Sequence, residues 1–114
     1  MARVLVVDDS SFMRKRMIKS LEGAGHEVIG QARDGAQAFE LYRSLCPDFV
    51  VMDITMRGTD GITGARMIKA LDPEARILFV SIVTDQEVRQ KALALGALGF
   101  IGKNEHDRLL EIIG

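Results

Sequence analysis

The sequence predicts an α/β domain in which five strands alternate with five helices around a mostly parallel sheet. Short apolar runs alternate with segments of helical apolar periodicity along the whole chain. Several runs are nearly continuous in apolar residues, which is typical of strands covered on both faces of a parallel sheet. Each run is joined to the next by a segment long enough for a helix, as right-handed βαβ crossovers require.

Size and composition limit the architecture and the function. With 114 residues, 47% of them hydrophobic, the chain can bury one core, so residues 1–114 are expected to form a single domain. The formal net charge of -1 at pH 7 argues against direct binding to nucleic acid or to a membrane surface. The only cysteine, Cys46, cannot form an internal disulfide. No signal peptide or membrane-spanning run is present, and a cytoplasmic location is expected.

The first predicted strand is the apolar run Val4–Val7. Ser10 and Ser11 follow it and suit a helix N-cap, because a serine hydroxyl accepts a hydrogen bond from a free backbone N–H. Apolar residues then recur at helical spacing over Phe12–Leu21, and two glycines end the helix. Its basic residues are expected to form a solvated face; they are Arg14, Lys15, Arg16 and Lys19.

The next two strands flank a second helix. Glu27–Ala32 is predicted as a shorter strand with fewer apolar residues. Asp34 suits the N-cap of the helix that follows, and Pro47 ends that helix. The run Phe49–Met52 is predicted as a buried strand and leads directly into Asp53.

The second half of the chain repeats this alternation. An Asp72-Pro73 pair ends the third helix, because the residue before a proline disfavours helical geometry. Gly96 ends the fourth. The predicted helices and strands are, in order, helix Ile62–Leu71, strand Arg76–Ser81, helix Asp85–Leu95, strand Gly99–Ile101 and helix Asn104–Ile113. The two histidines, His26 and His106, are expected at the surface.

Polar side chains follow four of the strands. Asp8 and Asp9 follow the first, Asp53 the third, Ser81 the fourth and Lys103 the fifth. Parallel strands bring their carboxyl ends to one edge of the sheet, where open α/β sheets bind ligands. Three close carboxylates repel one another, so some must be protonated or a cation must lie among them. Mg²⁺ is the best candidate, since it prefers hard oxygen ligands and needs few carboxylates.

This set of residues can transfer a phosphoryl group. With a cation at Asp8 and Asp9, the Asp53 carboxylate can attack phosphorus and form an acyl phosphate. Lys103 can place a positive charge on one phosphoryl oxygen, and the Ser81 hydroxyl can donate a hydrogen bond to another. The modification replaces about one negative charge with about two, which is enough to reorder the loop that follows Ser81.

The motifs VVDDS, MDITMRGTDG, LFVS and GFIGK resemble the receiver domain of bacterial two-component response regulators. The layout is closest to the single-domain chemotaxis (CheY-like) type, and the resemblance covers essentially the whole chain. It implies a flavodoxin-like, doubly wound fold with strand order 2-1-3-4-5. It also implies that Asp53 accepts phosphate from a sensor histidine kinase or a phosphotransfer protein, and that Ser81 and Lys103 contact the phosphoryl group.

The same resemblance implies a metal site and a switch. Asp8 and Asp9 would form the acidic pocket, and Mg²⁺ would be held by Asp9, Asp53 and the main-chain carbonyl of Thr55. Phe100 matches the aromatic residue thought to turn inward as the serine moves toward the phosphate. The face made by the last two helices and the last strand would then signal to an effector protein or an output domain. Enzymatic activity would be limited to self-phosphotransfer and slow autodephosphorylation.

Three residues depart from the family pattern. Arg57 replaces a proline and puts a cation near the site, which affects the expected lifetime of the phosphoryl group. Ile82 replaces a small residue and could crowd the entrance. Asn104 replaces a proline whose preceding bond is typically cis, and a cis bond before another residue costs roughly 2.5–4 kcal/mol. We therefore expect either a cis Lys103–Asn104 bond or a trans bond with a rearranged loop.

Two alternative functions stay open at this point. A phosphohydrolase or phosphomutase could also use an aspartyl phosphate, although the sequence lacks the DxD pair and the room for a substrate cap. A degenerate receiver could act as a phosphorylation-independent interaction module, given Arg57, Ile82 and Asn104. The kinase, the output pathway and the oligomeric state cannot be determined from the residues.

Overall fold

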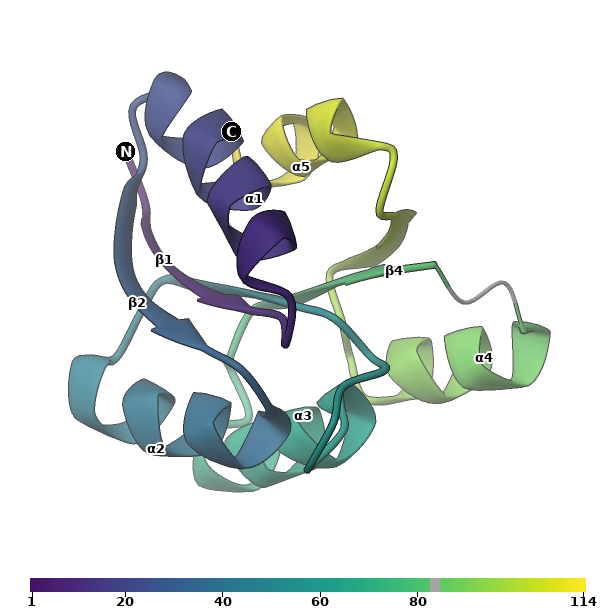
Figure 1. Ribbon diagram of the computed structural model, residues 1–114. Coiled ribbons are helices and arrows are strands. Elements are labelled where there is room, and N and C mark those ends of the chain that lie inside the picture. The colour runs from purple at the N-terminus through teal and green to yellow at the C-terminus, as the bar shows by residue number, and fades with distance from the viewer. Residues whose placement is uncertain (83–84) are drawn as a thin grey trace.

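The computed structural model describes residues 1–82 and 85–114, and over these residues the chain forms five helices and one five-stranded sheet (Figure 1). The strands are all parallel and lie in the order β2-β1-β3-β4-β5, which confirms the expected fold class and strand order. The elements are β1 Arg3–Val7, α1 Ser11–Gly23, β2 Glu27–Ala32, α2 Gly35–Leu45, β3 Phe49–Met52, α3 Gly61–Leu71, β4 Ile77–Ser81, α4 Gln86–Ala94, β5 Gly99–Gly102 and α5 His106–Ile113.

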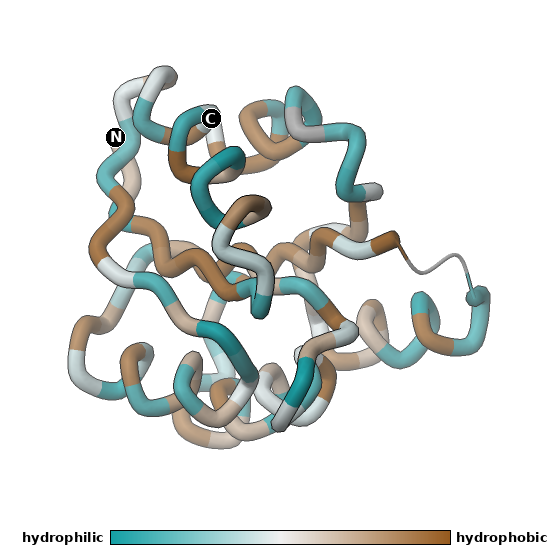
Figure 2. The backbone as a smooth tube through the Cα atoms, viewed as in Figure 1, coloured by the Kyte–Doolittle hydropathy of each residue, from teal (hydrophilic) through white to brown (hydrophobic). Residues whose placement is uncertain are grey.

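Helices cover both faces of the sheet. Figure 1 shows α1 and α5 on one side and α2, α3 and α4 on the other. Alternate residues of a strand point to opposite faces, so Leu5 and Val7 join the core under α2 and α3, whereas Val4 and Val6 join the core under α1 and α5. Figure 2 shows the resulting pattern: hydrophobic colour is concentrated on the central strands, and it alternates with hydrophilic colour along the helices.

The strand register aligns the polar strand ends. Val7 of β1 is the register partner of Met52 of β3, so Asp8 and Asp53 leave the sheet at the same level. Ser81 pairs with Gly102 in the same way, which brings Lys103 to this edge. The pairing of four strands, all with carboxyl ends on one edge, therefore assembles the predicted residues.

Side chains cap most of the helices. The two predicted N-caps are confirmed, because the side chains of Ser10 and Asp34 accept hydrogen bonds from Met13 N–H and Gln37 N–H. The carboxylates of Asp60 and Asp85 cap α3 and α4 in the same manner. Each cap satisfies a backbone donor that the first helical turn leaves free.

Some predicted boundaries are wrong by one or two residues. The fourth strand begins at Ile77 rather than Arg76, and the last helix begins at His106 rather than Asn104. The shift in the last helix has a local cause: the backbone N–H of Glu105 donates to the Gly102 carbonyl at 3.0 Å, forming a turn instead of a helix start.

His26 is buried, contrary to the surface position expected from the sequence. Its side chain is 6% exposed, and its Nδ1 accepts a hydrogen bond from the Ala2 backbone N–H at 3.0 Å. Its own backbone N–H donates to the Leu21 carbonyl, so His26 links the start of the chain to the end of α1. The side chain of His106 lies outside the part of the chain that the structure describes.

The lengths of the helices bear on the prediction that the chain has no membrane-spanning segment. No helix formed by residues 1–82 and 85–114 combines the length and the apolar character that crossing a bilayer requires.

Candidate functional site

Three carboxylates converge at the carboxyl edge of the sheet. Asp8 and Asp53 are buried, 1% and 2% exposed, and Asp9 is half-buried. Each can offer one oxygen such that all three oxygens lie within 4.8 Å of one another. The structure thus brings together the acidic residues that the sequence placed after β1 and β3.

Lys103 closes this cluster from the end of β5. Its Nζ lies 3.1 Å from Asp8 Oδ2 and 3.0 Å from Asp53 Oδ2, and its side chain is 17% exposed. The ammonium group therefore bridges two buried carboxylates that would otherwise repel each other. This position agrees with the prediction that Lys103 shares a site with Asp53.

The bond after Lys103 is trans, because none of the described peptide bonds is cis. The first of the two expected outcomes, a cis Lys103–Asn104 bond, is therefore wrong. The lysine nevertheless points into the acidic cluster.

A short turn accommodates the trans bond. The Glu105 carboxylate accepts a hydrogen bond from Gly102 N–H at 3.0 Å, and Lys103 N–H donates to the Ser81 carbonyl at 3.3 Å. The bond from Gly102, with Arg108 nearby, lowers the pKa of Glu105. Sequence reasoning missed Glu105; its only signal was an acidic residue three positions after a glycine at a strand end.

Burial and charge set the ionisation of the cluster. Burial raises the pKa of Asp53, and the hydrogen bond and charge of Lys103 offset this only in part. Burial alone would lower the pKa of Lys103, but its hydrogen bonds to Asp53 and Asp8 raise it overall. The lysine thus stays protonated, while Asp53 carries a carboxylate that is more basic than usual.

Hydrogen bonds to backbone groups hold the two segments beside the acidic cluster, the one that follows β1 and the one that follows β3. Asp8 Oδ1 accepts a hydrogen bond from Ser10 N–H at 2.9 Å, and Arg14 Nη1 donates to the Asp8 carbonyl at 2.6 Å. Arg14 is therefore half-buried rather than part of a fully solvated basic face. Gly61 N–H donates to the Ile54 carbonyl, and a Cβ on Gly61 would overlap the carbonyl oxygen of Asp53.

The β3–α3 loop contributes Arg57 to the acidic cluster. The Arg57 backbone N–H donates to Asp9 Oδ2 at 3.1 Å, and Arg57 Nε lies 3.6 Å from the same oxygen. Burial of Asp9 acts to raise its pKa, but the hydrogen bonds and charge of Arg57, together with the charge of Lys103, lower it overall. Thr55 lies in the same loop and is exposed.

The residues present fit a small divalent cation. Asp53 Oδ1 is buried and has no hydrogen-bond partner among the described residues. Carboxylate oxygens are hard ligands of the kind Mg²⁺ prefers, and Mg²⁺ completes its shell with water and phosphate oxygens. The unpaired Asp53 oxygen and the two neighbouring carboxylates therefore offer a suitable donor set.

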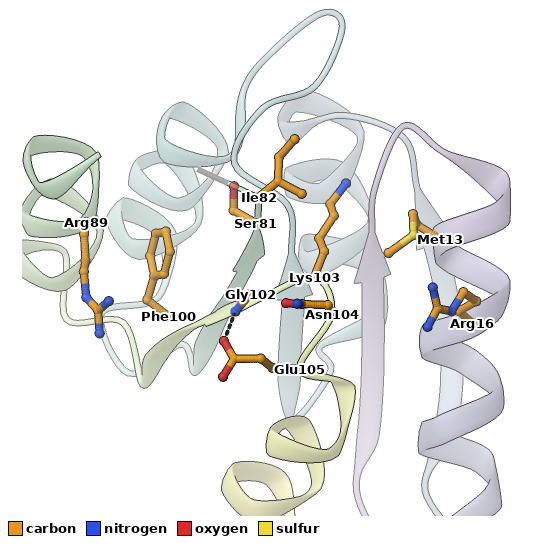
Figure 3. A pocket seen from close by; sticks show the side chains of 10 residues that line it. All are labelled: Met13, Arg16, Ser81, Ile82, Arg89, Phe100, Gly102, Lys103, Asn104 and Glu105. Atoms are coloured by element: carbon orange, nitrogen blue, oxygen red, sulfur yellow. Dashed lines mark hydrogen bonds between the residues drawn. The ribbon is translucent and has the colours of Figure 1, made fainter. Parts of the chain in front are cut away.

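Ser81, Phe100 and Lys103 line a common cavity of about 590 Å³ (Figure 3). Ser81 is 2% exposed at the end of β4, and Phe100 is half-buried with the Arg89 guanidinium 5.5 Å from its ring centre. Figure 3 shows Arg89 and Phe100 on one side of the cavity, and Met13 and Arg16 of α1 on the other. The predicted switch residues therefore lie together beside the acidic cluster.

Ile82 lies at the edge of this cavity with 75% of its surface exposed. Its side chain extends outward rather than into the core, as Figure 3 shows.

Comparison with known proteins agrees with this geometry. The family model "Response regulator receiver domain" matches residues 4–114. The chain is 45% identical over 112 residues to the chemotaxis protein CheY of Bacillus subtilis, covering 97% of this chain and 93% of that protein. It is 43% identical over 101 residues to CheY of Thermotoga maritima, covering 89% of this chain and 84% of that protein.

Solved structures give the same result. A CheX–CheY–BeF3–Mg²⁺ complex from Borrelia burgdorferi matches with a TM-score of 0.92 and 32% identity, covering 97% of this chain and 85% of that chain. The response regulator domain of Thermotoga maritima CheB matches with a TM-score of 0.88 and 35% identity, covering 96% of this chain and 90% of that chain. The family match over nearly the whole chain, the strand order and the acidic cluster show that the protein belongs to the response regulator receiver domain family.

Proposed function

We propose that this receiver domain is a Mg²⁺-dependent phosphoacceptor that takes a phosphoryl group on Asp53. The observation that carries the proposal is the position of Lys103 Nζ, 3.1 Å from Asp8 Oδ2 and 3.0 Å from Asp53 Oδ2, beside a third carboxylate. A half-buried lysine that bridges two carboxylates at a sheet edge can hold an incoming anionic group.

The transfer would proceed by attack of the Asp53 carboxylate on phosphorus. A bond from Asp53 oxygen to phosphorus forms as the bond to the donor's leaving group breaks, and the leaving group takes up a proton. When bound by Asp9, Asp53 and the Thr55 carbonyl, Mg²⁺ would offset negative charge on the phosphoryl oxygens.

The new phosphoryl group would be held by residues already at the site. Lys103 can pair with one oxygen, and the Ser81 hydroxyl can donate to another. Movement of Ser81 would make room for Phe100 to turn, which would alter the face of α4, β5 and α5. Phosphorylation would favour the conformer that binds the phosphoryl group better.

The proposed phosphoryl donor is a sensor histidine kinase or a phosphotransfer protein. The proposed target of the phosphorylated domain is an effector protein or an output domain. Residues 1–114 would act as one cytoplasmic receiver domain. One contact argues against the interaction-module alternative: Lys103 enters the acidic cluster despite Asn104.

Intact mass after incubation with Mg²⁺ and acetyl phosphate tests the proposal. We expect a gain of one phosphoryl group, which Asp53→Asn and a metal chelator should each abolish. Asp107→Asn, which changes an exposed carboxylate on α5, should leave the gain intact. A folded, Mg²⁺-binding protein that gains no mass would contradict the proposal, and turnover of a small phosphate ester would favour a phosphohydrolase instead.

A further inference from the structure

Arg57 contacts the one carboxylate of the cluster that Lys103 does not pair with. Its backbone N–H and its Nε both approach Asp9 Oδ2, at 3.1 Å and 3.6 Å. Lys103 pairs with Asp8 and Asp53 instead. Among the described residues, the three carboxylates thus have a half-buried cation, Lys103, on the inner side and an exposed cation, Arg57, on the outer side.

The side chain of Arg57 can leave without disturbing the loop. It is 91% exposed, so little packing holds it. The backbone beside it is anchored, because Thr59 accepts a hydrogen bond from Gly35 N–H at 2.7 Å. Gly58 has a φ of 85°, and a Cβ there would lie 2.7 Å from Asp34 Oδ2. The Arg57 guanidinium can therefore move while the backbone of the loop stays in place.

The charges at the cluster favour exchange of this guanidinium for a divalent cation. Three carboxylates paired with Lys103 and Arg57 leave one negative charge uncompensated. A divalent cation added to this set would leave an excess positive charge, whereas the cation in place of the Arg57 guanidinium gives exact neutrality. The divalent cation and the guanidinium would both bind the Asp9 carboxylate, and they would repel each other at close range.

We propose that Arg57 is an internal competitor for the divalent cation at Asp9, so that metal binding releases its side chain. The proposal rests on the metal site of the proposed function. Arg57 thereby weakens Mg²⁺ binding and makes the affinity depend on ionic strength. It is a positioning residue for Asp9 in the metal-free protein, not a ligand.

Isothermal titration calorimetry with Mg²⁺, at low and at physiological ionic strength, tests whether Arg57 competes with the cation. Arg57→Gln removes the positive charge and keeps the backbone N–H, whereas Arg57→Lys keeps the charge. Lys19→Gln is the matched control, because it removes an exposed positive charge on α1. We expect Arg57→Gln to tighten Mg²⁺ binding about three- to tenfold at low salt, as removal of an exposed cation near the metal should. Arg57→Lys should fall between it and the wild type, and Lys19→Gln should change affinity less than about twofold.

A second readout follows the side chain directly. The Nε–H resonance of Arg57, identified by its absence in Arg57→Gln, should shift when Mg²⁺ is added to the wild type. The affinity gain of Arg57→Gln should shrink as salt rises, because the Debye length falls to about 8 Å at 0.15 M.

The possible outcomes separate this inference from the proposed function. Equal Mg²⁺ affinity in wild type and Arg57→Gln would overturn the inference, while phosphorylation of Asp53 could still stand. If neither protein binds Mg²⁺, both the inference and the metal dependence of the proposed function fail. Binding by Arg57→Gln but not by wild type would support the inference in its strongest form.

Discussion

At the scale of single residues, Asp53 lies where it can accept a phosphoryl group, and the burial of its charge lowers the stability of the fold. Its side chain is 3% exposed, and it shares one lysine with Asp8. Two buried carboxylates therefore depend on a single ammonium group, and Asp53 Oδ1 has no hydrogen-bond partner among the described residues. The shared lysine therefore compensates the burial of the Asp53 charge only in part.

Asp53→Asn should therefore stabilise the metal-free protein. We expect the free energy of unfolding to rise by about 1 kcal/mol at neutral pH, because a neutral amide replaces a buried charge while Asp8 still pairs with Lys103. Urea denaturation followed by circular dichroism measures the change. Asp107→Asn should alter stability by less than about 0.5 kcal/mol. Loss of stability in Asp53→Asn would show that Lys103 needs both carboxylates.

The same change should depend on pH in a defined direction. Burial raises the pKa of Asp53 above 3.8, so the folded protein binds a proton before the unfolded chain does as pH falls. Wild-type folding gains stability over that interval, and the advantage of Asp53→Asn should shrink from neutral pH toward 3.8. Lys103 titrates far above this range and does not contribute. A pH-independent difference between the two proteins would contradict the assignment.

At the scale of elements, α2 and α3 are joined by close backbone contact and by one side-chain hydrogen bond. Gly35 and Gly64 allow the two helices to approach, since a Cβ on either glycine would lie too close to the other's backbone. At the far end, the Tyr42 hydroxyl donates to Asp72 Oδ2 at 2.6 Å. The pair of helices that supports the loop around Asp53 is thus fixed at both ends.

Tyr42 is the only tyrosine, so its titration can be followed by absorbance alone. Burial, together with the hydrogen bond to Asp72, raises its pKa above the ordinary value of 10.0. We expect tyrosinate absorbance to appear at higher pH than in a denatured control. Tyr42→Phe should lower the free energy of unfolding by about 1.5 kcal/mol, the usual contribution of a hydrogen bond to a charged partner. Tyrosine absorbance that titrates as in the denatured chain would argue against the Asp72 contact.

At the scale of the whole molecule, the inner strands of the sheet and helix α4 differ in burial. All five residues of β4 are buried, and so are four of the five in β1, whereas α4 buries Ala92 alone. Few buried side chains therefore oppose a movement of α4. A receiver domain that signals through the face containing α4 would use a helix that is held by few buried contacts.

Hydrogen exchange should show this difference directly. We expect backbone amides of α4 to exchange faster than those of β1 and β3, because few buried contacts oppose local opening of α4. Exchange measured by mass spectrometry on peptides covering 86–94 and 3–7 gives the comparison. Equal protection of the two segments would contradict a weakly held α4.

The sequence by itself determined the alternation of strands and helices, and with it the site. Apolar runs and helical periodicity depend on local side-chain order, so these signals survive without tertiary information. Asp8, Asp53, Ser81 and Lys103 followed from the rule that parallel strands share one carboxyl edge. The resemblance supplied the strand order, which local patterns do not carry.

Only the tertiary structure decided contacts between residues far apart in sequence. The burial of His26 depends on Ala2 N–H, the side of Asp9 on which Arg57 lies depends on how two loops meet, and Glu105 fills a turn left by a trans bond. Such contacts are fixed by packing of the whole chain, because each polar group must find a partner once water is excluded. Local order therefore predicted the strand-end residues of the candidate site, and the fold decided which further residues join them and how their charges are paired.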